Sequence, residues 1–304
     1  MPKFSNEDYE ILAADVVHDA FYSDSSYRGK ISKQRQYAEV IIRKILDIDP
    51  AATVTLGRKD IVKQIAAIPD HAFLENAIAG LKGDGDQDTH TQNLGSVTEA
   101  DYRRTTDSLF DMLAYLPIRY FGRYRFGSNN EVMSAFSLLP PIIRYKVLDY
   151  LQKQEPDNIS VVDKYVLILL KNFDETTAID WIEDNKARLE SPPTVSEEVK
   201  RKYIEQYGKE AAESMLEDGP QNMYEVCKGK IESLKGKNAG KQYPTFEKVL
   251  PYYKEKGILS GNTPEIKQFN DMMDFLFLGR KAENVNVEEP LTIVNILTSG
   301  LGET

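Results

Sequence analysis

Apolar residues recur at steps of three and four along most of this chain, the spacing that places them on one face of an α-helix. In the segment that begins near Ser32, for example, the apolar stripe consists of Ala38, Ile41, Ile42 and Ile45. The same pattern predicts a helix from about residue 6, two shorter helices over 59–68 and 72–81, and a long helix after residue 98. Alternation typical of strands is scarce, with residues 285–297 as the best extended candidate. The pattern predicts an all-α protein.

Polar residues mark several predicted helix starts. A capping box needs a Ser or Thr followed three residues later by a side chain that reaches back to its backbone N–H. Acidic residues stand at this spacing after Ser5, Thr98 and Ser160. Thr263 precedes Pro264, which suits the first position of a helix. Pro117 falls inside the long helix after Thr98, where it predicts a kink or an early end.

A glycine-rich polar stretch over residues 122–130 predicts a domain boundary after a complete set of helices. We therefore expect a helical bundle over residues 1–126 and a second helical region of unknown type over 131–304. The second region contains the apolar run 165–170, and its Lys- and Gly-rich stretch 228–241 predicts an exposed connection.

Composition limits the function. Hydrophobic residues make up 41% of the 304 residues, which is enough for a sizeable core, and the single cysteine, Cys227, permits no internal disulfide. The net charge of −10 argues against a large positively charged surface that binds nucleic acid. No apolar run approaches the roughly 20 residues that cross a bilayer, and the N-terminus lacks the pattern of a secretory signal. These features predict a soluble, cytoplasmic protein without a membrane contact.

The stretch 81–90, LKGDGDQDTH, combines glycines, aspartates and His90, and its composition predicts an acidic loop between helices. A calcium loop that began at Asp84 would need glycine at its sixth position and an acid at its twelfth. Thr89 and Gly95 stand there instead. A zinc site would need further His or Cys ligands at a recognisable spacing, which the chain does not offer. We therefore expect neither a metal nor a cofactor.

The stretch Lys33–Glu39, KQRQYAE, resembles the K-L-R-Q-F-A-E helix of HEPN-like domains, known from the N-terminal region of type I restriction endonuclease motor subunits and related defence-associated proteins. That branch continues with I-R-x-x-G-N-x-A-x-H and a long helix. The residues in register with this second motif are Leu81, Lys82, Gly85, Asp86, Asp88 and His90. Lys replaces Arg, Asp replaces Asn, and Asp88 replaces a small apolar residue. The resemblance covers about residues 5–125.

The resemblance implies a structural motif made of Arg35, Glu39, Gly85, Asp86 and His90. Gly85 would allow a tight turn between two packed helices, and Asp86 would satisfy backbone donors in that turn. His90 would then face the helix that bears Arg35 and Glu39. On this interpretation the motif ties helices together, and Arg35 and Glu39, four residues apart, form an intrahelical pair.

Catalytic HEPN proteins imply an alternative, which is metal-independent cleavage of RNA. In such a mechanism His90 would assist proton transfer from the attacking 2′-hydroxyl, and Arg35 or Lys82 would stabilise the phosphorane charge. Catalytic members place an Arg four to six residues before the His, and the positions four to seven before His90 carry no cation. The sequence leaves open whether the protein is an enzyme.

A third feature is the run 118–126, in which Arg119, Arg123 and Arg125 alternate with aromatic residues. Such a run could supply phosphate contacts and base-stacking surfaces for nucleic acid. The simpler interpretation is that the cations lie near helix carbonyls and that the aromatic rings pack in the interior.

The resemblance to HEPN-like domains implies an accessory or recognition component of a prokaryotic anti-phage defence system, of restriction or abortive-infection type, with a HEPN-like domain that is not catalytic. Its expected partners are proteins of a defence complex or a second copy of the chain, with nucleic acid as a further candidate. Two alternatives stay open. One is a ribonuclease toxin that uses His90, and the other is a helical adaptor for protein–protein interaction unrelated to defence.

Overall fold

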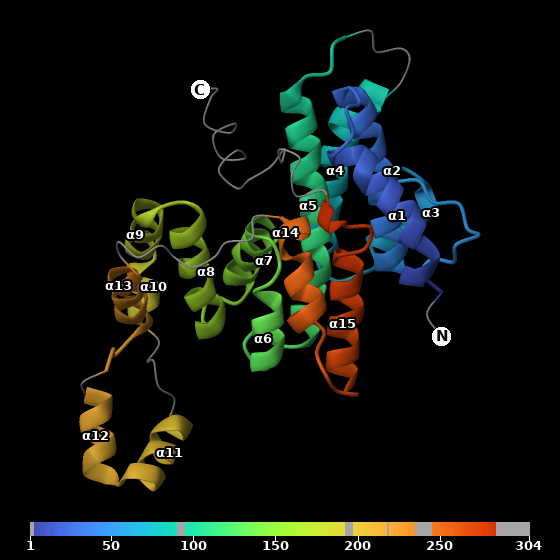
Figure 1. The fold of residues 1–304 in the computed structure, drawn as a ribbon. Coiled ribbons are helices and arrows are strands. Elements are labelled where there is room, and N and C mark those ends of the chain that lie inside the picture. Colours follow the sequence, from blue (N-terminus) through green and yellow to red (C-terminus); the bar gives the residue numbers. More distant parts are fainter. Residues whose placement is uncertain (1–2, 90–94, 192–196, 218, 235–244, 284–304) are drawn as a thin grey trace. The chain divides into compact units, whose positions relative to one another are not determined.

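The computed structural model describes residues 3–89, 95–191, 197–217, 219–234 and 245–283, and within these ranges the chain is helical and contains no strand (Figure 1). The prediction of an all-α fold is confirmed. The chain divides into two compact units, of which unit 1 comprises residues 1–147 and 243–304 and unit 2 comprises residues 148–242.

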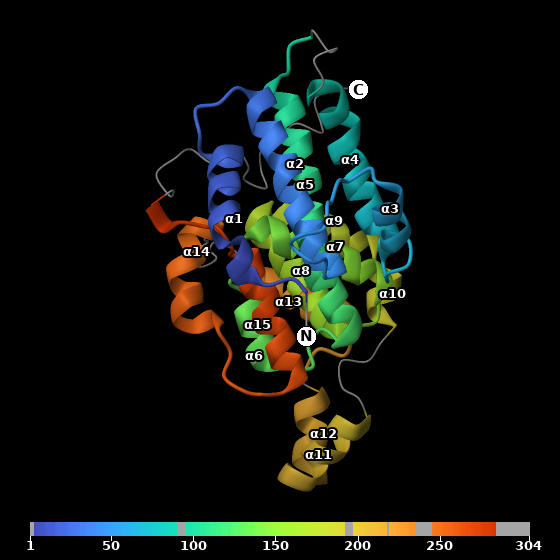
Figure 2. The ribbon, with the colours of Figure 1, turned by 90° about the vertical axis from the view of Figure 1, so that its right-hand side faces the viewer.

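Unit 1 is built around helix α5 (Glu99–Arg123). Helix α4 packs along α5, α2 packs against α1, α4 and α5, and α15 returns from the end of the described chain to pack against α5 (Figures 1 and 2). The other helices that begin in this unit are α1 (Asn6–Phe21), α2 (Tyr27–Leu46), α3 (Lys59–Ile65), α4 (His71–Thr89), α6 (Asn130–Phe136), α7 (Pro141–Gln154), α14 (Phe246–Tyr252), the π-helix η1 (Tyr253–Gly257) and α15 (Pro264–Leu276).

The core of unit 1 follows from the apolar stripes of these helices. Ala38, Ile41 and Ile42 of α2 and Leu109 and Leu113 of α5 are fully buried. Burial of one such aliphatic side chain contributes about 1.5–3 kcal/mol. Aromatic rings fill the remaining space, and several are almost completely buried: Tyr37, Tyr102, Tyr115, Phe126, Phe136, Phe269 and Phe275.

Unit 2 contains α8 (Ile159–Asn172), α9 (Glu175–Asp184), α10 (Lys186–Glu190) and α13 (Met223–Leu234), which pack on one another. It also contains α11 (Glu197–Tyr207) and α12 (Lys209–Glu217), two helices that pack against each other across Gly208. Gly208 has φ of +82°, a backbone conformation that glycine adopts without strain.

Some predicted helix starts are confirmed and others are wrong. Thr98 forms the reciprocal capping box with Asp101, and Thr263 caps α15 with Pro264 in its first turn. Ser5 stands at the N-cap of α1 but makes no side-chain capping bond. The predicted cap at Ser160 is wrong, because the side chain of Asn158 accepts the N–H groups of the first turn of α8. Pro117 lies inside α5, which continues to Arg123.

Two further predictions about segments differ from the structure. Helix α2 begins at Tyr27 and not near Ser32, because Ser26 accepts a hydrogen bond from the backbone N–H of Gly29. The acidic loop predicted in the stretch 81–90 is instead helical up to Thr89, where α4 ends, and His90 lies outside the described residues. Glycine costs about 1 kcal/mol in a helix interior, which disfavours a helix without excluding it. The extended candidate 285–297 lies outside the described residues.

The boundary expected between residues 126 and 131 does not coincide with the division of the structure. Phe126 follows α5 and packs its ring against Phe121 and against Phe136 of α6, with ring centroids 4.7 and 5.5 Å apart. Residues 122–130 therefore lie within unit 1. Of the two glycines that suggested a boundary there, Gly122 lies in the last turn of α5, and Gly127, at φ of +90°, lies in the turn between α5 and α6.

Replacing Gly229 by Ala is expected to stabilise the protein by about 0.5–1 kcal/mol. Gly229 lies in the interior of α13, and an added Cβ would meet no atom within 4 Å. The matched control is Gly80→Ala in α4, where the new Cβ would clash with the Ser108 hydroxyl. Urea unfolding should show a gain for Gly229→Ala and none for Gly80→Ala. An equal gain from both substitutions would contradict the packing described here.

The protein is expected to lose stability as pH rises above about 10, the ordinary pKa of a phenol. Burial raises the pKa of five tyrosines in unit 1, and that of Tyr115, which donates a hydrogen bond to the Pro69 carbonyl, to about 12. The other four are Tyr37, Tyr102, Tyr120 and Tyr253. Above pH 10 the unfolded chain releases these protons while the folded chain keeps them, so unfolding becomes progressively easier up to the raised pKa values.

Tyrosinate absorbance and circular dichroism, followed together through an alkaline titration, check this pH dependence. The part of the absorbance that comes from the five buried tyrosines should appear in one cooperative step together with the loss of circular dichroism, and Tyr115→Phe should make the loss of stability less steep. Gradual ionisation of every tyrosine near pH 10 in a still-folded protein would contradict it.

Candidate functional site

Helix α2 contains the first motif, Lys33–Glu39, and is called the motif helix below. Its Arg35 and Glu39 lie one turn apart and are both half-buried. Burial raises the pKa of the Glu39 carboxyl, while the charges of Arg35 and Arg43 act in the opposite direction. A cation within a few ångströms stabilises the ionised form of a carboxyl. The Arg35 charge therefore acts on the Glu39 carboxyl, and the intrahelical pair of these two side chains stays a prediction.

The described part of the second motif, Leu81 to Asp88, lies on α4, which packs against α2. Lys82 turns toward the loop before α3, where its Nζ would lie 3.2 Å from a Cβ built on Gly57. Gly85 and Asp86 belong to the last turns of α4 and not to a tight turn. His90 lies outside the described residues, so its predicted contact with Arg35 and Glu39 stays a prediction.

The run of arginines and aromatic residues is divided between core and surface. Tyr120, Phe121 and Phe126 are buried, and Tyr120 packs against Phe269 of α15 with ring centroids 5.3 Å apart. Buried rings offer no faces to nucleic-acid bases. Arg125 follows the end of α5 and is exposed. Tyr120 therefore serves the packing of α5 against α15, and Phe121 and Phe126 serve its packing against α6.

Arg119 and Arg123 lie one turn apart on α5 and line the same pocket. The Arg119 Nη1 donates to the carbonyl of Ile45 at 2.7 Å, in the last turn of α2. Cations favour this end of a helix because its last carbonyls lack partners. The Arg123 Nη1 donates to Gln268 Oε1 of α15 at 2.6 Å. The two arginines thus reach from α5 to α2 and to α15.

The pocket has a cavity volume of about 300 Å³ and lies entirely within unit 1. That volume is at the lower end of the range for small-molecule sites. Helices α2, α5 and α15 supply most of its wall, and the N-terminal segment adds Phe4. Its polar lining residues are Lys44, Asp47, Arg119, Arg123, Gln268 and Asp271, and its apolar ones are Phe4, Ile45, Leu116, Tyr120 and Met272.

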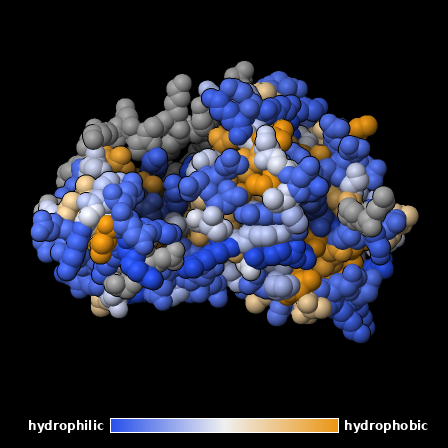
Figure 3. All heavy atoms as spheres, turned by 90° about the horizontal axis from the view of Figure 1, so that it is seen from below, coloured by the Kyte–Doolittle hydropathy of each residue, from blue (hydrophilic) through white to orange (hydrophobic). Residues whose placement is uncertain are grey.

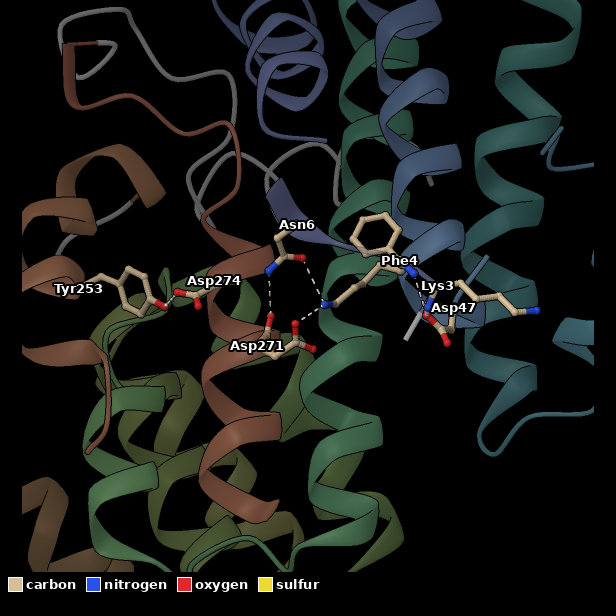
Figure 4. A network of polar contacts seen from close by, with 8 residues as sticks. Lys3, Phe4, Asn6, Asp47, Tyr253, Asp271 and Asp274 are labelled. Carbon is tan, nitrogen blue, oxygen red and sulfur yellow. Dashed lines mark hydrogen bonds and ion pairs between the residues drawn. The ribbon is translucent and has the colours of Figure 1, made fainter. Parts of the chain in front are cut away.

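One wall of the pocket is a clasp formed by Lys44 and Asp271 together with Asn6 (Figure 4). The Lys44 ammonium lies 2.7 Å from a carboxylate oxygen of Asp271 and donates to Asn6 Oδ1 at 3.2 Å. It also lies 5.3 Å from the centre of the Phe4 ring and 5.6 Å from that of Phe275. The clasp joins the N-terminal segment, α2 and α15.

Asp47 holds the N-terminal segment from the other side (Figure 4). Its carboxylate accepts the backbone N–H groups of Lys3 and Phe4 at 2.7 and 2.9 Å. Asp47 ends α2 in the left-handed conformation, with φ of +52°. Asp and Asn tolerate this conformation better than most residues. The end of α2 therefore positions both a carboxylate and, through Ile45, a carbonyl around the pocket.

Sequence reasoning found Arg119 and Arg123 but missed Lys44, Asp47 and Asp271. The two arginines stood out because they share a run with aromatic residues. Lys44 and Asp271 are 227 positions apart, and nothing in either local sequence distinguishes them from other charged residues of an amphipathic helix. Only the return of α15 to α5 brings them together.

Comparisons with known proteins give no family for this chain. No family model matches it, and neither a curated protein nor a solved structure is similar to it. Among the residues that the structure describes, no group of three or more His, Cys, Asp or Glu side chains is placed to hold a metal ion. Within the same ranges, no helix is both long and apolar enough to span a membrane.

Proposed function

We propose that this protein is an accessory or recognition component of a prokaryotic anti-phage defence system, of restriction or abortive-infection type. Its N-terminal HEPN-like helices assemble the complex and do not cleave RNA. The observation that carries the proposal is the central place of motif helix α2, which packs against α1, α4 and α5. Two of its motif residues, Tyr37 and Ala38, are fully buried. The motif residues thus act in holding helices together.

The order of the elements also supports this proposal. A motif helix, a second helix that carries Leu81 and Lys82, and a long helix capped at Thr98 follow one another as the resemblance implies. The half-buried positions of Arg35 and Glu39, one turn apart on α2, favour a structural role, because the opposite charge of Glu39 weakens the attraction of Arg35 for a phosphorane. The helical course of Gly85 and Asp86 departs from the family's turn.

Phage challenge of the native host tests the proposal. Deletion of the gene, with its neighbours intact, should raise the plating efficiency of at least one restricted phage. Both the wild-type protein and His90→Ala should restore the lower efficiency, because the proposed role needs no catalysis by His90. Unchanged plating for every phage would favour an adaptor unrelated to defence. Restoration by the wild type but not by a folded His90→Ala protein would favour the ribonuclease.

Affinity purification from the same host identifies the partner. A tagged copy should co-elute with a nuclease or helicase subunit encoded nearby, and mass determination of the eluate would name it. A chain that elutes alone, at the mass of one copy, would contradict a role in assembly.

A further inference from the structure

The pocket at the end of α2 contains more positive than negative charge. Lys44, Arg119 and Arg123 line it together with Asp47 and Asp271. Lys44 and Asp271 neutralise each other at 2.7 Å, and the Asp47 carboxylate accepts two backbone N–H groups. The charges of the two arginines are left without a carboxylate, since neither forms an ion pair within the described part of the chain.

The two arginines also stand one turn apart on α5 and line the same pocket. Residues four apart on a helix are separated by about 6 Å along its axis and point to the same side. Like charges in this arrangement repel and destabilise the helix. Arg119 and Arg123 nevertheless line one pocket on α5. An anion bound between the two side chains would attract both of them and so offset their repulsion.

Each guanidinium has donors to offer such an anion. A guanidinium carries five N–H groups in a rigid plane, and each of these two makes one hydrogen bond to a described residue, to Ile45 or to Gln268. These single bonds hold the side chains in place over the pocket. The remaining N–H groups suit the paired contacts that arginine makes with phosphate oxygens.

We propose that this pocket binds the phosphate group of a small ligand, with Arg119 and Arg123 on the phosphate and the apolar wall on the remainder. A phosphate monoester carries a charge of about −1.5 to −2 at pH 7. The pocket lining has three cations and two carboxylates, a net charge of +1, and it attracts this group more strongly than it would a single carboxylate. Leu116, Tyr120 and Met272 supply the apolar wall. This inference does not depend on a role in defence.

Calorimetric titration of the purified full-length chain tests the inference, with adenosine 5′-monophosphate, adenosine and inorganic phosphate as probes. The monophosphate should bind, and adenosine should bind at least about tenfold more weakly, a difference of 1.4 kcal/mol. Comparable affinity for inorganic phosphate would show that free phosphate is the ligand. Preference for the monophosphate would show that the apolar wall takes part. Absence of heat with both phosphates would overturn the inference.

Arg123→Gln is the informative variant because Arg123 is exposed, so its replacement leaves the core intact. It should weaken binding of the monophosphate by about tenfold, whereas Arg125→Gln, two residues away and outside the pocket, should change it by less than about twofold. Equal affinity of Arg123→Gln and wild type would overturn the inference, as would equal losses in both variants. Much tighter binding of a single-stranded oligonucleotide, lost in both variants, would point to a nucleic-acid surface and against a small ligand.

Discussion

Replacing Glu247 by Gln is expected to destabilise unit 1 by about 3–5 kcal/mol, because it leaves a buried guanidinium without its counter-charge. Arg280 and Glu247 form an ion pair at 3.1 Å in which both side chains are almost inaccessible to solvent. Burial alone would lower the pKa of Arg280, but the charge and hydrogen bond of Glu247, together with Tyr37 and Tyr22, outweigh burial, and the pKa lies above its ordinary value. The native state therefore holds a charged arginine that depends on one acid.

The surroundings of Arg280 increase this dependence. Its guanidinium lies 4.5 Å from the centre of the Phe246 ring and 5.2 Å from that of Phe21. Its Nε and Nη2 atoms have no hydrogen-bond partner among the described residues. The rings favour a cation electrostatically, but they cannot replace a carboxylate. Because Phe21 belongs to α1 and Phe246 to α14, this cluster also joins the two sequence segments of unit 1.

Chemical denaturation gives the free energy of unfolding of the wild type, Glu247→Gln and a control, Glu99→Gln. Glu99 pairs with Arg103 on the surface of α5, so its replacement should cost at most about 0.5 kcal/mol. The double replacement Glu247→Leu with Arg280→Met should recover most of the loss, because it removes both charges. A loss below about 1 kcal/mol for Glu247→Gln would contradict the buried pair.

Gly279→Ala is expected to be the second most disruptive substitution, at about 3 kcal/mol or more. Gly279 has φ of +75°, where a Cβ costs roughly 1–2 kcal/mol. The added Cβ would also lie 2.5 Å from the backbone carbon of Ala13 and 2.7 Å from the backbone nitrogen of Ala14. These atoms belong to helix α1 and cannot move like the end of a side chain, so overpacking adds a further 1–3 kcal/mol.

Gly208→Ala separates the two contributions to this loss. Gly208 has φ of +82°, and an added Cβ there would meet no atom within 4 Å. Its replacement should therefore cost only the backbone strain, roughly 1–2 kcal/mol. Thermal unfolding of both variants should give the larger loss for Gly279→Ala. Equal losses would show that α1 does not lie against Gly279.

The sequence predicts those features of the fold that depend on neighbouring residues. The helical class follows from apolar spacing, and the caps at Thr98 and Thr263 involve groups three residues apart. The cap at Ser160 was wrong because Asn158, two residues earlier, offers an equally suitable acceptor to the same turn. The prediction of a loop over Gly83–Thr89 was wrong, because glycine permits a turn but does not impose one.

The candidate site was only partly predictable for a related reason. Arg119 and Arg123 could be found because their run is unusual in composition. The pocket also needs Asp271 of α15 and Phe4 of the N-terminal segment, and their position depends on the packing of helices far apart in sequence. Arg280 and Glu247 could not be found either, since nothing in the local sequence distinguishes a buried charged residue from an exposed one.

RNA cleavage by the purified full-length protein is the most direct test of the central claim, that the motif residues hold the bundle together and do not catalyse. A structured RNA and a single-stranded RNA would be incubated with the wild type and with His90→Ala, and fragments would be resolved by denaturing electrophoresis. The proposed role predicts intact RNA with both proteins. Fragments produced by the wild type and abolished by His90→Ala would contradict it.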